Sequence, residues 1–105
     1  MPVAKITVLR RMANPDIVEE YMGDECKTDV WPCGAFEDGQ EFLLENADGP
    51  PEGFCAWAWT DIHKYVLTIA CGGDFSPWVR EKGTAIACCT DGYRPVVFKI
   101  EALSI

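Results

Sequence analysis

One stretch of this sequence constrains the fold more than any other. Residues 54–70 carry apolar side chains three and four positions apart, which is the spacing of an amphipathic helix. Its boundaries are sharp, because residues 48–53 are rich in proline and glycine and because Gly72-Gly73 follows. We therefore predict one long helix here. The side chains expected to face the core are Phe54, Ala58, Ile62, Tyr65, Val66 and Ile69.

The rest of the chain predicts a second helix and four strands. Apolar and polar residues alternate from Ala4 to Val8, which is the period of a half-buried strand. Asn14-Pro15 is a favourable helix start, and Gly23 is a plausible stop for a helix of about two turns. Further strands are predicted over residues 41–46, 84–89 and 95–103, and the last two form a hairpin.

The resulting order, β-α-β-α-β-β, predicts an α+β fold. We expect a small mixed or antiparallel sheet of about four strands with two helices packed on one face. An open sheet and a small, partly closed barrel both satisfy this pattern. Since 105 residues are about one domain long, the whole chain, residues 1–105, is predicted to form a single domain.

Charge limits the classes of partner. The net charge is −8, and twelve of the seventeen carboxylates fall between Asn14 and Glu52, where Lys27 is the one base. A strongly acidic surface repels phosphate backbones and anionic lipid, so neither nucleic acid nor membrane is an expected partner. Solubility explains such a surface, and a basic partner or a second copy of the chain would also match it. The sequence shows neither an export signal nor a long apolar span, and we expect a cytoplasmic protein.

Cysteine is the most informative residue type. In a reducing compartment the six cysteines should be thiols, thiolates or metal ligands rather than disulfides. Zinc sites usually have ligand pairs two to four residues apart, which this sequence lacks. We nevertheless expect Cys33, Cys55 and the pair Cys88 and Cys89 to meet at a pocket, with a metal ion or an iron–sulfur cluster as the cofactor it would hold. The alternative is that each cysteine is a small buried hydrophobe.

The placement of these cysteines supports the pocket hypothesis. Cys33 lies in a turn, Cys55 in the first turn of the long helix, and Cys88 and Cys89 at a strand end. Helix starts and strand ends are where small α+β domains often build pockets. Because adjacent strand residues point to opposite faces, only one of Cys88 and Cys89 would join the other thiols.

Tryptophan and charged residues complete the candidate site. Trp57 and Trp59 stand about 200° apart on a helix, so one of them should line a pocket or an interface. Arg94 suits a carboxylate or phosphate ligand, or it pairs with Asp91 in the hairpin loop. His63, the only histidine, lies about two turns from Cys55 and makes a poor dyad with it.

Five segments of the chain form a recognisable set: Pro32-Cys33-Gly34, residues 36–42, residues 51–59, residues 88–96 and residues 98–101. Together they resemble a family of small prokaryotic proteins that is common in anaerobes and functionally uncharacterised. The resemblance implies one compact domain with recurrent cysteines at Cys33, Cys55 and one of Cys88 or Cys89, and it implies no activity, cofactor or catalytic residue.

Three functional hypotheses follow. The first is a binding or accessory module whose cysteine-lined pocket takes a metal, a cluster or a small ligand. The second is a small enzyme that uses Cys55 or a nearby carboxylate in acid–base or nucleophilic chemistry. The third is an interaction protein, a homodimer that uses an exposed tryptophan and the uneven charge.

Overall fold

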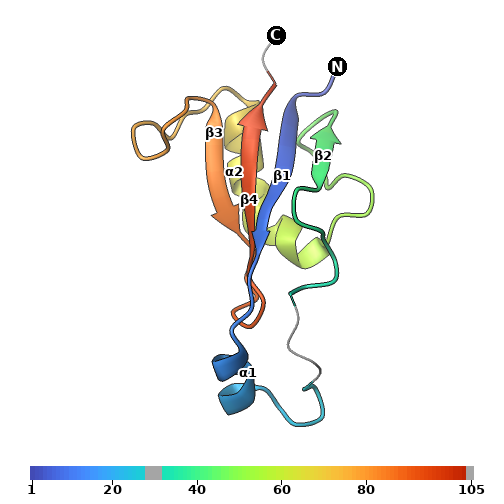
Figure 1. The fold of residues 1–105 in the computed structure, drawn as a ribbon. Helices are drawn as coiled ribbons and strands as arrows, with labels where there is room; N and C mark the ends of the chain where they lie inside the picture. Colours follow the sequence, from blue (N-terminus) through green and yellow to red (C-terminus); the bar gives the residue numbers. More distant parts are fainter. Residues whose placement is uncertain (28–31, 104–105) are drawn as a thin grey trace.

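The computed structural model describes residues 1–27 and 32–103, which form a four-stranded sheet, a long helix on one face of it and a short helix beyond its end (Figure 1). This is the α+β class that the sequence predicts. The elements in chain order are β1 (Ala4–Arg11), α1 (Pro15–Tyr21), β2 (Glu41–Leu44), α2 (Ala56–Ala70), β3 (Thr84–Cys88) and β4 (Val96–Ala102).

The sheet is antiparallel throughout, in the order β2-β1-β4-β3. The two terminal strands, β1 and β4, lie at its centre and pair along most of their length. The predicted hairpin of β3 and β4 is confirmed, with Ala85 opposite Ile100. Both outer strands remain as edges, so the sheet is open and the barrel alternative does not apply.

Helix α2 packs on one face of the sheet and encloses the core between them. Alternate residues of the central strands point toward the helix and are completely buried, as Ile6, Phe98 and Ile100 show. On α2, Ala58, Trp59, Ile62, Val66 and Ile69 are buried. The expected stripe is therefore present, with Phe54 and Tyr65 half-buried at its margin. Neither described helix is long and apolar enough to cross a membrane.

A bulge in β1 changes which arginine faces the helix side of the sheet. Val8 pairs with Phe98, but the next paired residue of β1 is Arg10, opposite Val97, so the register shifts by one residue. Without the bulge, Arg10 would follow Val8 on the inner face. Instead Arg11 stands opposite the buried Val96, and its side chain reaches the loop that precedes β2.

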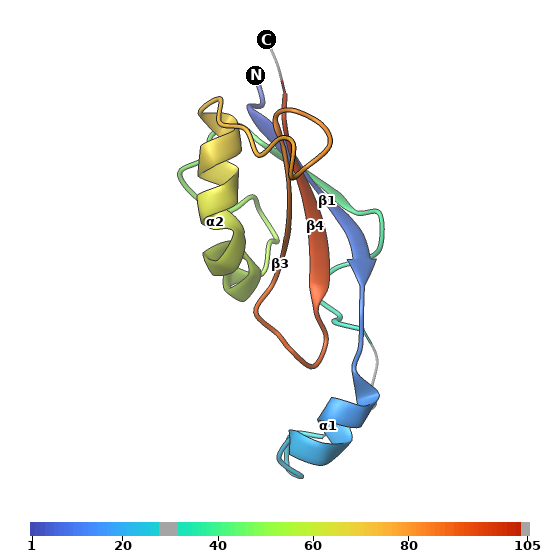
Figure 2. The ribbon, with the colours of Figure 1, turned by 90° about the vertical axis from the view of Figure 1, so that its left-hand side faces the viewer.

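The short helix α1 departs from the prediction that both helices cover the sheet. Figure 2 shows α1 beyond the end of the sheet and well away from α2. The physical reason is that α1 has seven residues and buries only Val18, which is too little apolar surface to hold a helix against a sheet.

Predicted boundaries also shift at β2 and α2. Strand β2 ends at Leu44, two residues earlier than expected, and α2 begins at Ala56. Cys55 is consequently the N-cap residue, with extended backbone angles, and not a residue of the first turn. Its side chain makes no capping hydrogen bond, so the helix start does not occupy the thiol.

The packing of α2 predicts unequal effects on its two faces. Ile62→Ala removes a completely buried side chain and should lower the free energy of unfolding by about 2–5 kcal/mol. Leu67→Ala, on the exposed side of the same helix, should change it by less than about 1 kcal/mol. Urea unfolding followed by circular dichroism measures both values, and equal losses would contradict this orientation of α2.

Candidate functional site

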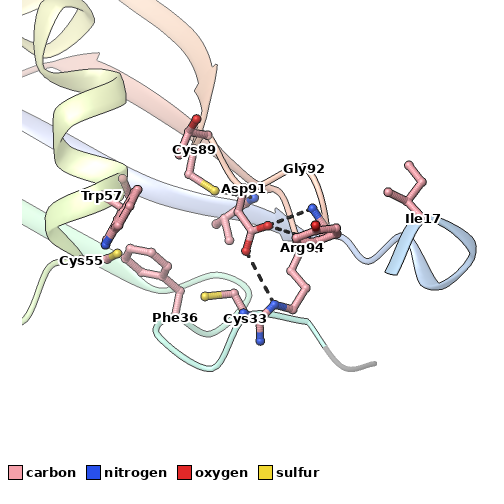
Figure 3. A pocket seen from close by; sticks show the side chains of 13 residues that line it. Ile17, Cys33, Phe36, Cys55, Trp57, Cys89, Asp91, Gly92 and Arg94 are labelled. Atoms are coloured by element: carbon pink, nitrogen blue, oxygen red, sulfur yellow. Dashed lines mark hydrogen bonds and ion pairs between the residues drawn. The ribbon is translucent and has the colours of Figure 1, made fainter. Parts of the chain in front are cut away.

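A cavity of about 730 Å³ lies at the end of the sheet where α2 begins (Figure 3). Three segments that are distant in the sequence form most of its wall: residues 33–36, residues 55–58 and residues 89–96. Ile17 of α1 adds a fourth contribution. The cavity lies between the start of α2 and the loop that joins β3 and β4, and these two segments are linked by a hydrogen bond from the Thr90 amide to the carboxylate of Asp61.

Three of the predicted cysteines, Cys33, Cys55 and Cys89, line this cavity from separate segments. Figure 3 shows their sulfur atoms on different sides of the same space. All three are half-buried against the hydrophobic core. The sulfur of Cys89 accepts a hydrogen bond from the Val96 amide at 3.3 Å, which holds this thiol beside β4.

Cys88 does not join these thiols. It pairs with Val97 at the end of β3 and is exposed, whereas the amide of Cys89 donates to the carbonyl of the buried Val96. The two neighbouring cysteines thus point to opposite faces of the hairpin, as expected for adjacent strand residues.

The predicted metal ligand set of Cys33, Cys55, Cys88 and Cys89 has no support in the structure. Across residues 1–27 and 32–103, no group of three or more His, Cys, Asp or Glu side chains is placed to hold a metal ion. The physical reason is that three thiols stand on different walls of a wide cavity and the fourth lies outside it.

Asp91 and Arg94 form the polar side of the cavity. The Oδ1 atom of Asp91 accepts hydrogen bonds from the amides of Tyr93 at 2.8 Å and Arg94 at 3.2 Å, which fixes the hairpin loop. Its Oδ2 atom lies 3.6 Å from the Nε atom of Arg94. At this distance the two groups form an ion pair, but they are too far apart for a hydrogen bond.

The Nε–H group of Arg94 is therefore unusual. It is buried and has no hydrogen-bond acceptor among the described residues. A buried donor without an acceptor costs about 1–3 kcal/mol, so native structures seldom leave one in place without a purpose.

The two tryptophans of α2 take different roles. Trp57 is 76% exposed and lines the cavity, where Figure 3 shows it next to Cys55. Trp59 is buried and stacks on His63, so of these two tryptophans it is Trp57 that lines this cavity. Because residues two positions apart lie on nearly opposite sides of a helix, one indole points inward and the other outward. Trp31 lies outside the described residues.

Arg11 holds the cavity wall that contains Cys33. Its Nη1 atom donates hydrogen bonds to the carbonyls of Cys33 at 3.2 Å and Phe36 at 3.0 Å. Its Nε atom donates to Asp38 at 3.1 Å. The sequence pattern does not predict this role for Arg11, because the alternation of β1 without its bulge would place Arg10 on this face.

Phe36 is the other residue that the sequence analysis missed. It is 3% exposed and lines the cavity, where it forms the apolar floor. Its ring meets those of Phe42, Phe54 and Phe98 edge to face, with centroids 6.0, 5.0 and 5.2 Å away. An aromatic residue within a loop rich in glycine and charge is the signal that could have drawn attention to it.

Comparisons of the whole chain with protein-family models, with curated proteins and with solved structures find no match. The resemblance to a family of small prokaryotic proteins therefore stays a prediction, and function has to be argued from the geometry of the cavity.

The cavity combines an apolar floor, polarisable thiols, an exposed indole and a guanidinium. His63 does not line it, because its Nε2 atom donates to the carbonyl of Ala47 at 2.9 Å and its ring stacks on Trp59. No imidazole is thus available to serve as a base for a cavity thiol.

The ion pair at the Cys33 wall predicts a pH-dependent stability. Hydrogen bonds from Arg11 hold the pKa of Asp38 below its usual value of 3.8. A lowered pKa stabilises the folded state above pH 3.8, and the contribution disappears as the pH falls through the pKa of the folded protein. Asp38→Asn should therefore reduce stability at neutral pH and change it progressively less below pH 3.8.

Urea unfolding between pH 7 and about 2.5 tests this expectation. Glu37→Gln is the matched control, since no described residue forms an ion pair with that neighbouring carboxylate. A loss for Asp38→Asn that persists unchanged at the lowest pH would contradict the ion pair as its cause.

Proposed function

We propose that this protein is a binding module whose cavity takes a small organic ligand. The observation that carries the proposal is the convergence of Cys33, Cys55 and Cys89 with Trp57 and Arg94 on one space of about 730 Å³. That volume lies in the range of about 300–1,000 Å³ that is typical of small-molecule sites.

The lining suits a ligand that is largely apolar. Phe36, Ala58 and Val96 are almost completely buried and supply a hydrocarbon floor. The thiols of the three cysteines are soft and polarisable, and they pack favourably against aromatic rings. Trp57 stands at the exposed rim, where an indole can cover one side of a bound molecule. Burial of such a ligand would draw most of its affinity from removal of apolar surface from water.

We also propose that the module works in the cytoplasm. All six cysteines are unpaired, and three of them, Cys26, Cys71 and Cys88, are exposed. Exposed thiols persist in a reducing compartment and oxidise elsewhere. This proposal and the ligand proposal are independent of each other.

The proposal predicts that a neutral apolar probe binds beside Trp57. N-Phenyl-1-naphthylamine, which is uncharged at neutral pH and fluoresces in apolar surroundings, should bind at one site. Trp57→Ala should weaken its affinity by about two- to tenfold, because one face of the probe loses an aromatic contact. Trp78→Ala is the matched control, since that tryptophan is 78% exposed but lines a different, shallower hollow. A fluorescence titration measures both affinities, and a greater loss for Trp78→Ala would overturn the assignment.

Thiol protection locates the bound probe independently. Saturating N-phenyl-1-naphthylamine should slow the alkylation of Cys33, Cys55 and Cys89 by N-ethylmaleimide. It should leave the exposed Cys26, Cys71 and Cys88 unaffected, which makes these three thiols internal controls. Peptide mass spectrometry after brief labelling gives the rate at each position. Equal protection of all six, or of none, would show that the probe does not occupy this cavity.

A further inference from the structure

We infer that the ligand is a small organic anion, with an apolar body held by the cavity floor and a single negative group bound by Arg94. This inference rests on the proposed binding function and deepens it. The observation behind it is that the cavity is apolar except at one end, where the guanidinium of Arg94 meets it (Figure 3).

The loop that carries Arg94 is held in position before any ligand arrives. Asp91 accepts hydrogen bonds from the amides of Tyr93 and Arg94. Asn14 also holds this loop. Its side-chain Nδ2 atom donates to the carbonyl of Gly92 at 2.8 Å, and its backbone N–H donates to the carbonyl of Tyr93 at 2.8 Å. A guanidinium on a preorganised loop loses little conformational entropy on binding, which favours affinity.

The hydrogen-bonding capacity of Arg94 is not used up. Its Nε–H group is buried without an acceptor among the described residues, and Asp91 stands too far away, at 3.6 Å, to satisfy it. The side chain of Arg94 is 37% exposed, so the guanidinium is reachable from the cavity. A guanidinium binds a planar or tetrahedral anion through two parallel hydrogen bonds, which a small rotation of this side chain would allow.

The charges around the cavity are compatible with one additional negative group. Arg94 lines the cavity and pairs with Asp91, whereas Arg11 lies behind the Cys33 wall and pairs with Asp38. The Oδ1 atom of Asp91 is occupied by two backbone donors, which offset part of its negative charge. The net charge of the whole chain is −8, which repels a ligand of high negative charge more strongly than a monoanion.

Two matched probes separate the anion from the apolar body. 8-Anilinonaphthalene-1-sulfonate carries the ring system of N-phenyl-1-naphthylamine and adds one sulfonate. Arg94→Gln should weaken the binding of the sulfonate probe by about tenfold or more, because a charge-assisted hydrogen bond is lost, and it should weaken the binding of the neutral probe much less, because that probe has no negative group. Arg94→Lys retains the positive charge and should keep more affinity for the sulfonate probe than Arg94→Gln does.

Arg80→Gln is the matched control, because it also removes one positive charge but lies at the shallower hollow beside Trp78. The affinity of this variant for each probe should stay within about twofold of the wild-type value. Fluorescence titrations at one ionic strength measure every pair of protein and probe.

The outcomes distinguish the inference from the function on which it rests. Suppose that the neutral probe binds beside Trp57 but that Arg94→Gln lowers the affinity for both probes equally, or for neither. The anion assignment is then overturned and the binding function stands. If Arg80→Gln has the larger effect on the sulfonate probe, the anion site lies elsewhere and the assignment is likewise overturned. If the wild-type protein binds neither probe, the proposed function itself fails.

Discussion

The contact between helix α2 and the inner face of the sheet is the interaction on which the rest of the structure depends. Ile62, Val66 and Ile69 of the helix and Ile6, Phe98 and Ile100 of the two central strands are completely or almost completely buried. This single apolar layer holds together segments from both ends and the middle of the chain. It also decides where α2 begins relative to the β3–β4 loop. The candidate site is thus a consequence of core packing, since it lies in the space left at the end of that layer.

The polar interactions around the cavity hold the loops that form its walls, whereas the core itself is apolar. The bulge in β1 directs Arg11 toward the carbonyls of Cys33 and Phe36, which fixes a loop that has no secondary structure of its own. Asp91 does the same for the hairpin loop through the amides of Tyr93 and Arg94. Both walls are therefore held by hydrogen bonds within the protein, and an apolar cavity with one under-used guanidinium has the features of a small-molecule site.

The elements that could be predicted are those that local pattern determines. The alternation in β1, the spacing along α2 and the short connection between β3 and β4 all reflect contacts between residues close in sequence, and all three are present. The position of α1, and which of Trp57 and Trp59 faces the core, were not predictable, because each depends on which surface lies opposite. The predicted metal ligand set finds no support among the described residues for a related reason, since cysteine chemistry suggests ligands but does not give the distances between separate segments.

By itself, the sequence determined the class of the fold, the order of its elements, the acidic surface and the opposite orientation of Cys88 and Cys89, because periodicity and charge are properties of neighbouring residues. Only the tertiary structure decided that Cys33, Cys55 and Cys89 face one cavity, that Arg11 supports its wall and that the Nε–H group of Arg94 is buried there without an acceptor among the described residues. These are relations between residues from opposite parts of the chain. They arise when the sheet and α2 close on the core, and no local pattern encodes the space that remains between them.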